Sequence, residues 1–226
     1  MIPLKDDIRS QGRPIVNYSI IGLNCLVFLY QYLITDPQWF IMKYGTIPYE
    51  IVHGIDLPPF SSFPVHFNLI FSMFIHGGFL HIAGNMLFLW VFGDNVEDAF
   101  GKWRYIIFYI ISGICGSLLH ILVGANSKIP AVGASGAISG VLGAYAILYP
   151  RARVLALVPV FYFLRIMYLP AFAFIGIWFF YQLIYAASSG VAGGGVAWFA
   201  HIGGFIAGIV MGSTIKRRRR RWDFYF

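Results

Sequence analysis

The chain has 226 residues, of which 59% are hydrophobic and only 11% are charged, and its mean hydropathy is +0.73. This composition excludes an ordinary soluble domain and indicates a membrane protein with several spans. The net charge of +7 includes a basic run at 216–221, but such a run directly after an apolar segment usually fixes membrane topology, so we expect no nucleic-acid partner.

Six segments are apolar enough to be interpreted as membrane-spanning helices, since a span needs about 20 apolar residues to cross about 30 Å of hydrocarbon. In chain order they cover about residues 15–34, 80–96, 103–123, 135–149, 169–187 and 196–215. They leave little room for a soluble domain, so we predict an all-α polytopic membrane protein that forms one integral domain over residues 1–226. No A-x-A-like cleavage site follows the first span, which favours a retained anchor over a signal peptide.

The distribution of lysine and arginine predicts how the six spans are oriented. If both termini lie on one side, that side holds fourteen basic residues and the other holds only Lys43 and Lys128. The more basic side is normally cytoplasmic, so we expect cytoplasmic termini and a basic cytoplasmic tail at 216–226. The two cysteines, Cys25 and Cys115, fall inside predicted spans and indicate neither a disulfide nor a metal site.

Two of the connections between the predicted spans are unusually apolar. The first, about residues 36–79, is the longest, and its run FNLIFSMFIH predicts that part of it lies in the membrane interface. The second, at 150–168, carries three arginines among apolar residues. For this second connection we expect an interfacial segment or an early start to the fifth span, and not a seventh crossing.

The fourth predicted span is short. Ser135 to Leu148 is 14 residues, which gives a helix of about 21 Å at ~1.5 Å per residue. This is about 9 Å less than the hydrocarbon thickness. Pro150 marks the cytoplasmic end, so we expect Ser135 to lie below the external surface, beside a cavity that opens to the outside.

Several polar residues share this predicted depth. His201 lies about five residues into the sixth span, roughly 8 Å below the surface. His76, His81 and Asn85 gather at the external start of the second span. Polar residues inside a membrane are costly and are therefore candidates for function.

Small residues in the fourth and sixth spans predict that these two helices pack closely. Gly136 and Gly140 are four residues apart in the fourth span, and Gly204 and Gly208 are four apart in the sixth. Such ridges let helix backbones approach. Close packing would bring the Ser135 hydroxyl and an imidazole within hydrogen-bond distance.

These positions predict a serine nucleophile with a histidine base. Ser135 at a helix N-terminus also has free backbone N–H groups that can stabilise an oxyanion. No acidic residue lies at the same depth, so the arrangement would be a Ser–His dyad. His81 and Asn85 lie on one helical face and could donate to the oxyanion, or they could form a structural network. For His76 we favour a structural role.

A metal site is the competing chemical interpretation. His76, His81 and His201 could in principle supply three imidazole ligands. No H-E-x-x-H motif or supporting carboxylate accompanies them, and a metal site would leave the glycine-flanked serine unexplained. We therefore expect no metal.

Taken together, these residues resemble the rhomboid family of intramembrane serine proteases. The motifs that carry the resemblance are GASG at 133–136, HGGFLHIAGN at 76–85, AHIGGFIAG at 200–208 and FGKWRYIIFYIISG at 100–113. Each motif alone is weak, but the set occurs in order and on the expected helices. The resemblance extends over essentially the whole chain.

The resemblance implies a role for each matching residue. Ser135 would be the nucleophile and His201 the general base, while His81, Asn85 and the Ser135 backbone N–H would form the oxyanion hole. Gly133 would shape the loop before the serine, and Gly204 and Gly208 would let the sixth span pack on the fourth. The implied substrates are membrane-anchored proteins cut in or near a transmembrane segment, without a metal or organic cofactor. The fifth span, with GIWFFYQL at 176–183, is similar to the family's proposed lateral gate.

The chain departs from the family pattern at Ser139. Many members carry an aromatic residue four positions after the nucleophile, where it packs on the catalytic imidazole, so the sequence leaves open what orients His201. The first external connection also lacks the Trp-Arg pair of some members, since Trp103–Arg104 falls on the cytoplasmic side.

Two other functions stay open at this stage. One is a catalytically inactive relative that binds transmembrane helices, and the other is a small-solute transporter that uses the polar cavity. The compact plan is typical of a bacterial protein, so we expect the bacterial inner membrane, with the active site on the extracytoplasmic side and the lipid bilayer as surroundings.

Overall fold

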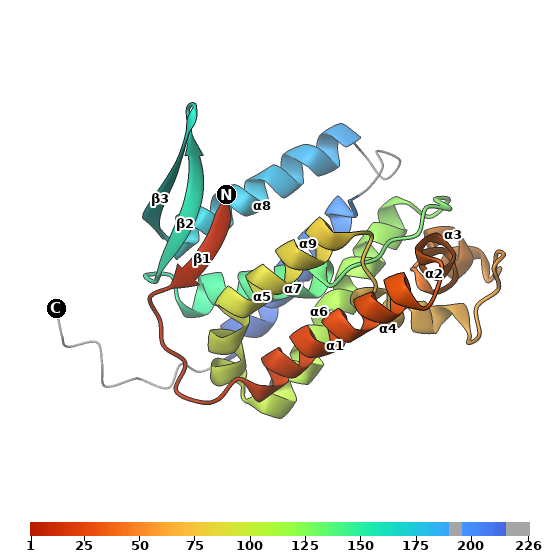
Figure 1. Cartoon of the computed structure of the whole chain (residues 1–226), viewed down its shortest axis with the longest axis horizontal. Helices are drawn as coiled ribbons and strands as arrows, with labels where there is room; N and C mark the ends of the chain where they lie inside the picture. Colours follow the sequence, from red (N-terminus) through yellow and green to blue (C-terminus); the bar gives the residue numbers. More distant parts are fainter. Residues whose placement is uncertain (190–195, 216–226) are drawn as a thin grey trace.

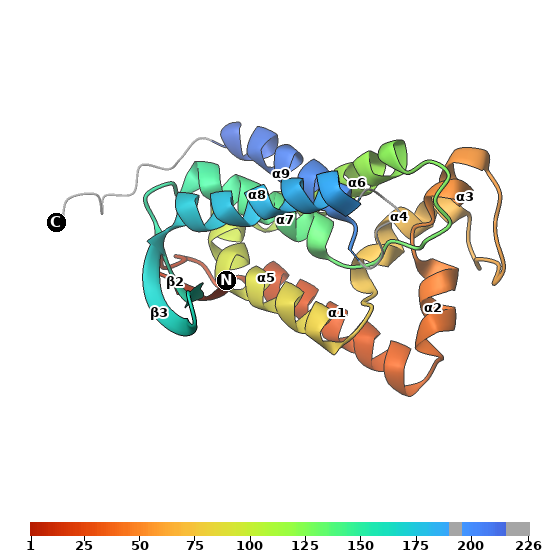
Figure 2. The same cartoon turned by 90° about the horizontal axis from the view of Figure 1, so that it is seen from above.

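A computed structural model describes residues 1–189 and 196–215. A helix overlaps each of the six expected ranges. The bounds of these six helices are α1 Ile15–Leu33, α5 Phe79–Phe100, α6 Lys102–Val123, α7 Ser135–Leu148, α8 Ala171–Ser189 and α9 Trp198–Ser213. They lie roughly along one direction, with α7 in their midst (Figures 1 and 2).

The length and composition of the helices identify candidate membrane spans. Among the described residues, α1, α6 and α8 are long and apolar enough to cross a membrane on their own. A fourth candidate is α5 together with the short helices at 65–74, which meet it at a bend of 78°. The two remaining helices, α7 and α9, are shorter and apolar. The 14-residue length of α7 is as the sequence predicted.

The long connection between α1 and α5 is folded into short helices. They are α2 Pro37–Tyr44, α3 Pro48–His53, η1 Val65–Phe67, α4 Asn68–Phe71 and η2 Ser72–Phe74. Local signals start and end them: Asp36 caps α2 by accepting a hydrogen bond from the Trp39 N–H (2.7 Å), and Gly54 ends α3 in the left-handed conformation. In both views α2 and α3 lie at the opposite end of the molecule from the sheet.

The fold is mostly helical, as expected, but it is not all-α, because the chain also contains a three-stranded antiparallel sheet. Its strands are β1 Ile2–Asp6, β2 Arg153–Val160 and β3 Phe163–Pro170, in the order β1-β2-β3. The connection at 150–168 is thus a β-hairpin and not an early turn of α8. Val154 and Ala156 of β2 alternate inward and are fully buried in the main core, which gives one face of the strand the period of two that a sheet needs.

Polar contacts attach the sheet to the helices. β1 pairs with β2 in the register Ile2↔Leu157 and Asp6↔Val154. The Asp6 carboxylate accepts hydrogen bonds from the Tyr145 hydroxyl of α7 and from Asn95 Nδ2 of α5 (2.9 Å). In both views β1 and the last described turn of α9 lie at the same end of the molecule.

Candidate active site

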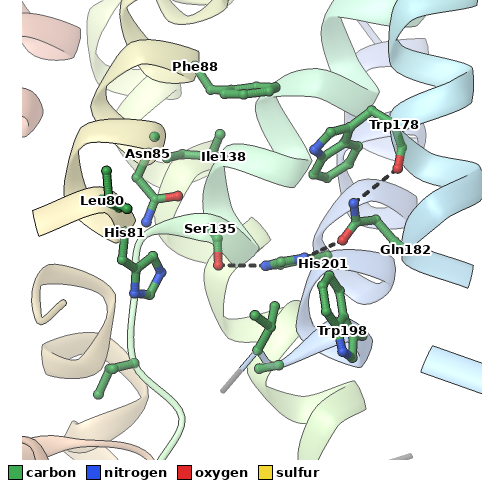
Figure 3. A pocket seen from close by; sticks show the side chains of 14 residues that line it. Leu80, His81, Asn85, Phe88, Ser135, Ile138, Trp178, Gln182, Trp198 and His201 are labelled. Atoms are coloured by element: carbon green, nitrogen blue, oxygen red, sulfur yellow. Dashed lines mark hydrogen bonds between the residues drawn. The ribbon is translucent and has the colours of Figure 1, made fainter. Parts of the chain in front are cut away.

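Ser135 and His201 meet at the contact between α7 and α9. Ser135 is the first residue of α7, and His201 lies in the first turn of α9 with its side chain buried. The Ser135 hydroxyl lies 2.7 Å from His201 Nε2 (Figure 3). Serine and imidazole are thus within the distance at which a base removes the hydroxyl proton during attack.

Glycine pairs on α7 and α9 permit this approach. A Cβ added at Gly204 would collide with the Gly136 carbonyl, and one added at Gly208 would collide with the Gly140 carbonyl. The two backbones therefore touch at two successive levels, as the small-residue spacing predicted. His201 and Ser135 lie beside the first of these levels.

Gly133 shapes the loop that leads into Ser135. Its φ is +121°, a conformation that residues with a Cβ rarely adopt, and its N–H donates to the Ser72 carbonyl (2.8 Å). A Cβ at this position would lie 2.7 Å from His81 Nε2. The absence of a side chain therefore lets the His81 ring lie directly against the loop.

His81 and Asn85 lie one turn apart on α5 and face the same space as Ser135. The Gly77 N–H donates to His81 Nδ1 (3.3 Å), so the ring proton of a neutral His81 is on Nε2, which faces the loop at Gly133. Asn85 Nδ2 is buried, and it has no hydrogen-bond partner among the described residues. Two donors thus face the cavity, and a buried donor without a partner is costly unless a ligand accepts from it.

His76 lies beside this group and does not line the cavity. Its ring is fully buried and meets the His81 ring edge to face, with centroids 5.1 Å apart. Its backbone exchanges two hydrogen bonds with the Gln31 side chain of α1 (2.9 and 3.3 Å). These contacts hold the turn before α5. Among the described residues, no three His, Cys, Asp or Glu side chains are grouped to hold a metal ion.

A cavity of about 310 Å³ lies over the Ser135–His201 pair. Ser135, His201, His81 and Asn85 all line it, and the rest of its wall is largely apolar. Its apolar members include Leu80, Phe88, Ile138, Trp178 and Trp198. Polar groups therefore converge at one point of an apolar cavity, which is the usual form of a site that binds and turns over a ligand.

A comparison with protein-family models now identifies the family. The model described as the Rhomboid domain matches residues 65–218, which contain Ser135, His201, His81 and Asn85. The chain belongs to the rhomboid family. Its family and its apolar helices identify it as a multi-pass integral membrane protein.

Curated relatives of this rhomboid come from several kinds of organism. It is 30% identical over 217 residues to "Rhomboid protein 1, mitochondrial" of Saccharomyces cerevisiae. The aligned region covers 90% of this chain and 56% of the relative. It is 41% identical over 76 residues to "Rhomboid protease GluP" of Bacillus subtilis (34% of this chain, 14% of the relative). It is 36% identical over 81 residues to "Rhomboid-type serine protease 2" of Emericella nidulans (36% and 16%).

This chain matches only part of each of these relatives. The rhomboid spans little more than half the length of the yeast relative and smaller shares of the other two. One relative is named as mitochondrial and another is bacterial, so the relatives do not support the expected bacterial inner membrane over another membrane.

In this rhomboid Gln182 lies beside His201, and the sequence alone did not predict this contact. Its Oε1 lies 2.7 Å from His201 Nδ1, on the side of the ring away from Ser135. Ser139, at the position where an aromatic residue was expected, donates instead to the Ser135 carbonyl (2.6 Å). The signal was present in the sequence, since Gln182 is a polar residue within a predicted span, and such residues are functional candidates.

Two tryptophans complete the surroundings of the imidazole. The Trp178 ring of α8 lies with its centroid 6.0 Å from that of His201, and the Trp198 ring meets it edge to face at 5.9 Å. Aromatic contact with the imidazole thus comes from α8 and from the start of α9, and not from α7.

Proposed function

We propose that this rhomboid is an intramembrane serine endopeptidase that hydrolyses peptide bonds in or near transmembrane segments of membrane proteins. Ser135 acts as the nucleophile and His201 as the general base. The observation that carries the proposal is the 2.7 Å contact between Ser135 Oγ and His201 Nε2 at the wall of the cavity. A serine hydroxyl alone is a weak nucleophile, and an adjacent imidazole activates it.

The reaction follows from this geometry in two stages. Ser135 Oγ attacks the carbonyl carbon of the peptide bond while its proton passes to His201 Nε2. The imidazolium gives this proton to the leaving amine, so the C–N bond breaks and an ester remains on Ser135. Water then loses a proton to His201 and hydrolyses the ester, which restores both side chains.

In this proposal three donors stabilise the oxyanion of each tetrahedral intermediate. They are His81 Nε2, Asn85 Nδ2, which has no hydrogen-bond partner in the described part of the chain, and the backbone N–H of Ser135 in the first turn of α7. The first N–H groups of a helix have no partner within the helix and carry the positive end of its dipole. Donors fixed in this way stabilise developing charge without reorganising.

The proposed arrangement in the membrane has six crossings, by α1, α5, α6, α7, α8 and α9, with both termini in the cytoplasm. The excess of basic residues on one side supports it, as does the position of β1 and the last described turn of α9 at one end of the molecule. The cavity then opens on the extracytoplasmic side, and the substrates are transmembrane proteins in the lipid bilayer. The chemistry uses neither a metal nor an organic cofactor.

Cleavage of a model transmembrane substrate in liposomes tests the proposal. We expect Ser135→Ala and His201→Ala to abolish cleavage and labelling by a serine-reactive fluorophosphonate, with unchanged expression and unfolding temperature. Ser213→Ala and His53→Ala are matched controls, because both side chains are exposed and neither lines the cavity. A folded wild-type protein that binds the substrate but is neither labelled nor active would instead indicate an inactive helix-binding relative.

A further inference from the structure

Gln182 makes two hydrogen bonds that together determine how its amide is oriented. The side chain is 5% exposed and comes from the fourth turn of α8. Its Nε2 lies 3.0 Å from the Trp178 carbonyl one turn earlier, and its Oε1 lies 2.7 Å from His201 Nδ1. A carbonyl oxygen can only accept, so the amide nitrogen must face Trp178 and the amide oxygen must face His201.

The orientation of the amide determines the tautomer of His201. Because Gln182 Oε1 can only accept, His201 Nδ1 must carry the ring proton in order to donate to it. The lone pair of a neutral imidazole is then on Nε2, which faces the Ser135 hydroxyl at 2.7 Å. This is the tautomer that can accept the serine proton, whereas the opposite tautomer would point an N–H at the hydroxyl and could not.

We propose that Gln182 is a positioning residue that holds His201 in the Nδ1–H tautomer and in its orientation toward Ser135. This inference rests on the proposed function and deepens it. The neutral amide orients the imidazole, as a carboxylate does in a Ser-His-Asp triad, without placing a charge among apolar helices. The imidazole is therefore oriented by a residue of α8, and not by an aromatic residue at the position of Ser139.

The location of Gln182 adds a structural consequence. Ser135 is on α7 and His201 is on α9, but both contacts that fix the amide orientation involve α8. The ability of His201 to act as a base therefore depends on a helix that carries neither of the two reacting residues. The titratable side chains whose charges act on His201 are His81 and His120, and neither is altered by a change at position 182.

Two substitutions of Gln182 separate positioning from packing. Gln182→Met keeps the length of the side chain and removes the acceptor, and Gln182→Glu keeps an acceptor and adds a negative charge. We expect Gln182→Met to lower kcat and the rate of fluorophosphonate labelling about 10- to 100-fold, because one hydrogen bond to a group that becomes charged is lost. KM should change less than about twofold. Gln182→Glu should retain most activity, with the acid limb of its pH–rate profile at higher pH, because a carboxylate stabilises the imidazolium.

A spectroscopic readout tests the tautomer independently of activity. In two-bond ¹H–¹⁵N spectra of protein labelled with ¹⁵N-histidine, the signals absent from His201→Ala identify His201. We expect the Nδ1–H pattern in the wild type and a mixture of tautomers in Gln182→Met. Tyr181→Phe, a neighbouring and half-exposed position on α8, is the control that should leave both activity and spectrum unchanged.

The outcomes distinguish this inference from the proposed function. If Gln182→Met matches the wild type in kcat while Ser135→Ala is inactive, or if wild-type His201 carries its proton on Nε2, Gln182 does not position the base. If the wild type neither cleaves nor is labelled, the proposed function fails, and the tautomer spectra still decide whether Gln182 fixes the ring.

Discussion

Gly208 of α9 lies so close to the backbone of Gly140 of α7 that no methyl group fits between them. The same relationship holds one turn earlier between Gly204 and Gly136. His201 precedes Gly208 by seven residues, which is about two helical turns, and so lies on the same face of α9. The distance from His201 to Ser135 is thus set by how closely the two backbones pack.

Gly208→Ala should destabilise the protein and reduce activity together. The added methyl group would collide with the Gly140 carbonyl and push α9 away from α7, and overpacking of this kind costs about 1–3 kcal/mol. Thermal unfolding in detergent measures the first effect and fluorophosphonate labelling the second. Gly176→Ala is the matched control in α8, since nothing lies within 4 Å of its added Cβ. Equal unfolding temperatures for the two variants would contradict the packing argument.

Gly133→Ala should affect activity more than stability. The new methyl group would displace the ring of His81, the proposed oxyanion donor, and loss of one such donor typically lowers kcat by about 10²–10³-fold. Gly54→Ala controls for backbone strain, because Gly54 also has a positive φ (+65°) but nothing within 4 Å of its added Cβ. We expect similar unfolding temperatures for the two variants and a loss of cleavage in Gly133→Ala alone. Full activity in Gly133→Ala would show that His81 does not depend on this glycine.

The helical part of the fold was predictable because it depends on local composition. Apolar runs bounded by polar or proline residues placed all six helices within a few residues, and the start of α7 at Ser135 was predicted correctly. The pairing of Ser135 with His201 followed from glycine spacing, which reports backbone approach directly.

The sheet and Gln182 were missed because both depend on contacts between segments that composition does not reveal. The run VLALVPV is apolar enough for a helix, but it pairs with residues 163–170 in a hairpin and with residues 2–6, about 150 positions earlier, and this pairing makes it a strand. Gln182 was visible as a polar residue in a span, but its direction depends on how α8 rotates against α9. No periodicity in the sequence determines that rotation.

The stability of the protein should fall as the pH rises through about 7, because of Asp6. Burial raises the pKa of this carboxyl from 3.8 to about 7, a rise opposed by the Tyr145 hydrogen bond and increased by Asp94 and Asp7. The folded state therefore binds a proton between about pH 4 and 7 that the unfolded state releases. Its stabilisation is complete below about pH 4 and is lost as the pH passes 7.

The comparison of wild type with Asp6→Asn isolates this effect. Asparagine stays neutral at every pH and still accepts from Tyr145, so the fall in unfolding temperature between pH 5 and 8 should be smaller in Asp6→Asn. The histidines contribute equally to both proteins and cancel in the difference. Asp7→Asn removes one of the charges that raise the pKa of Asp6, so its fall in unfolding temperature should be smaller than that of the wild type but larger than that of Asp6→Asn. Parallel curves for Asp6→Asn and wild type would mean that Asp6 is ionised in the folded protein.

The tip of the β2–β3 hairpin should lie in the membrane interface. Phe161 and Tyr162 are 95% and 98% exposed, Arg165 of β3 is exposed as well, and the hairpin extends sideways from the bundle near the start of α8 (Figure 1). Aromatic and arginine side chains together favour the boundary between lipid and water. In a Cys25→Ala, Cys115→Ala background, a nitroxide on Tyr162→Cys in liposomes should collide more with oxygen than with a water-soluble nickel chelate. A nitroxide on Lys128→Cys, in the polar loop before α7, should show the reverse preference. More frequent collision with the nickel chelate at Tyr162→Cys as well would place the hairpin in water.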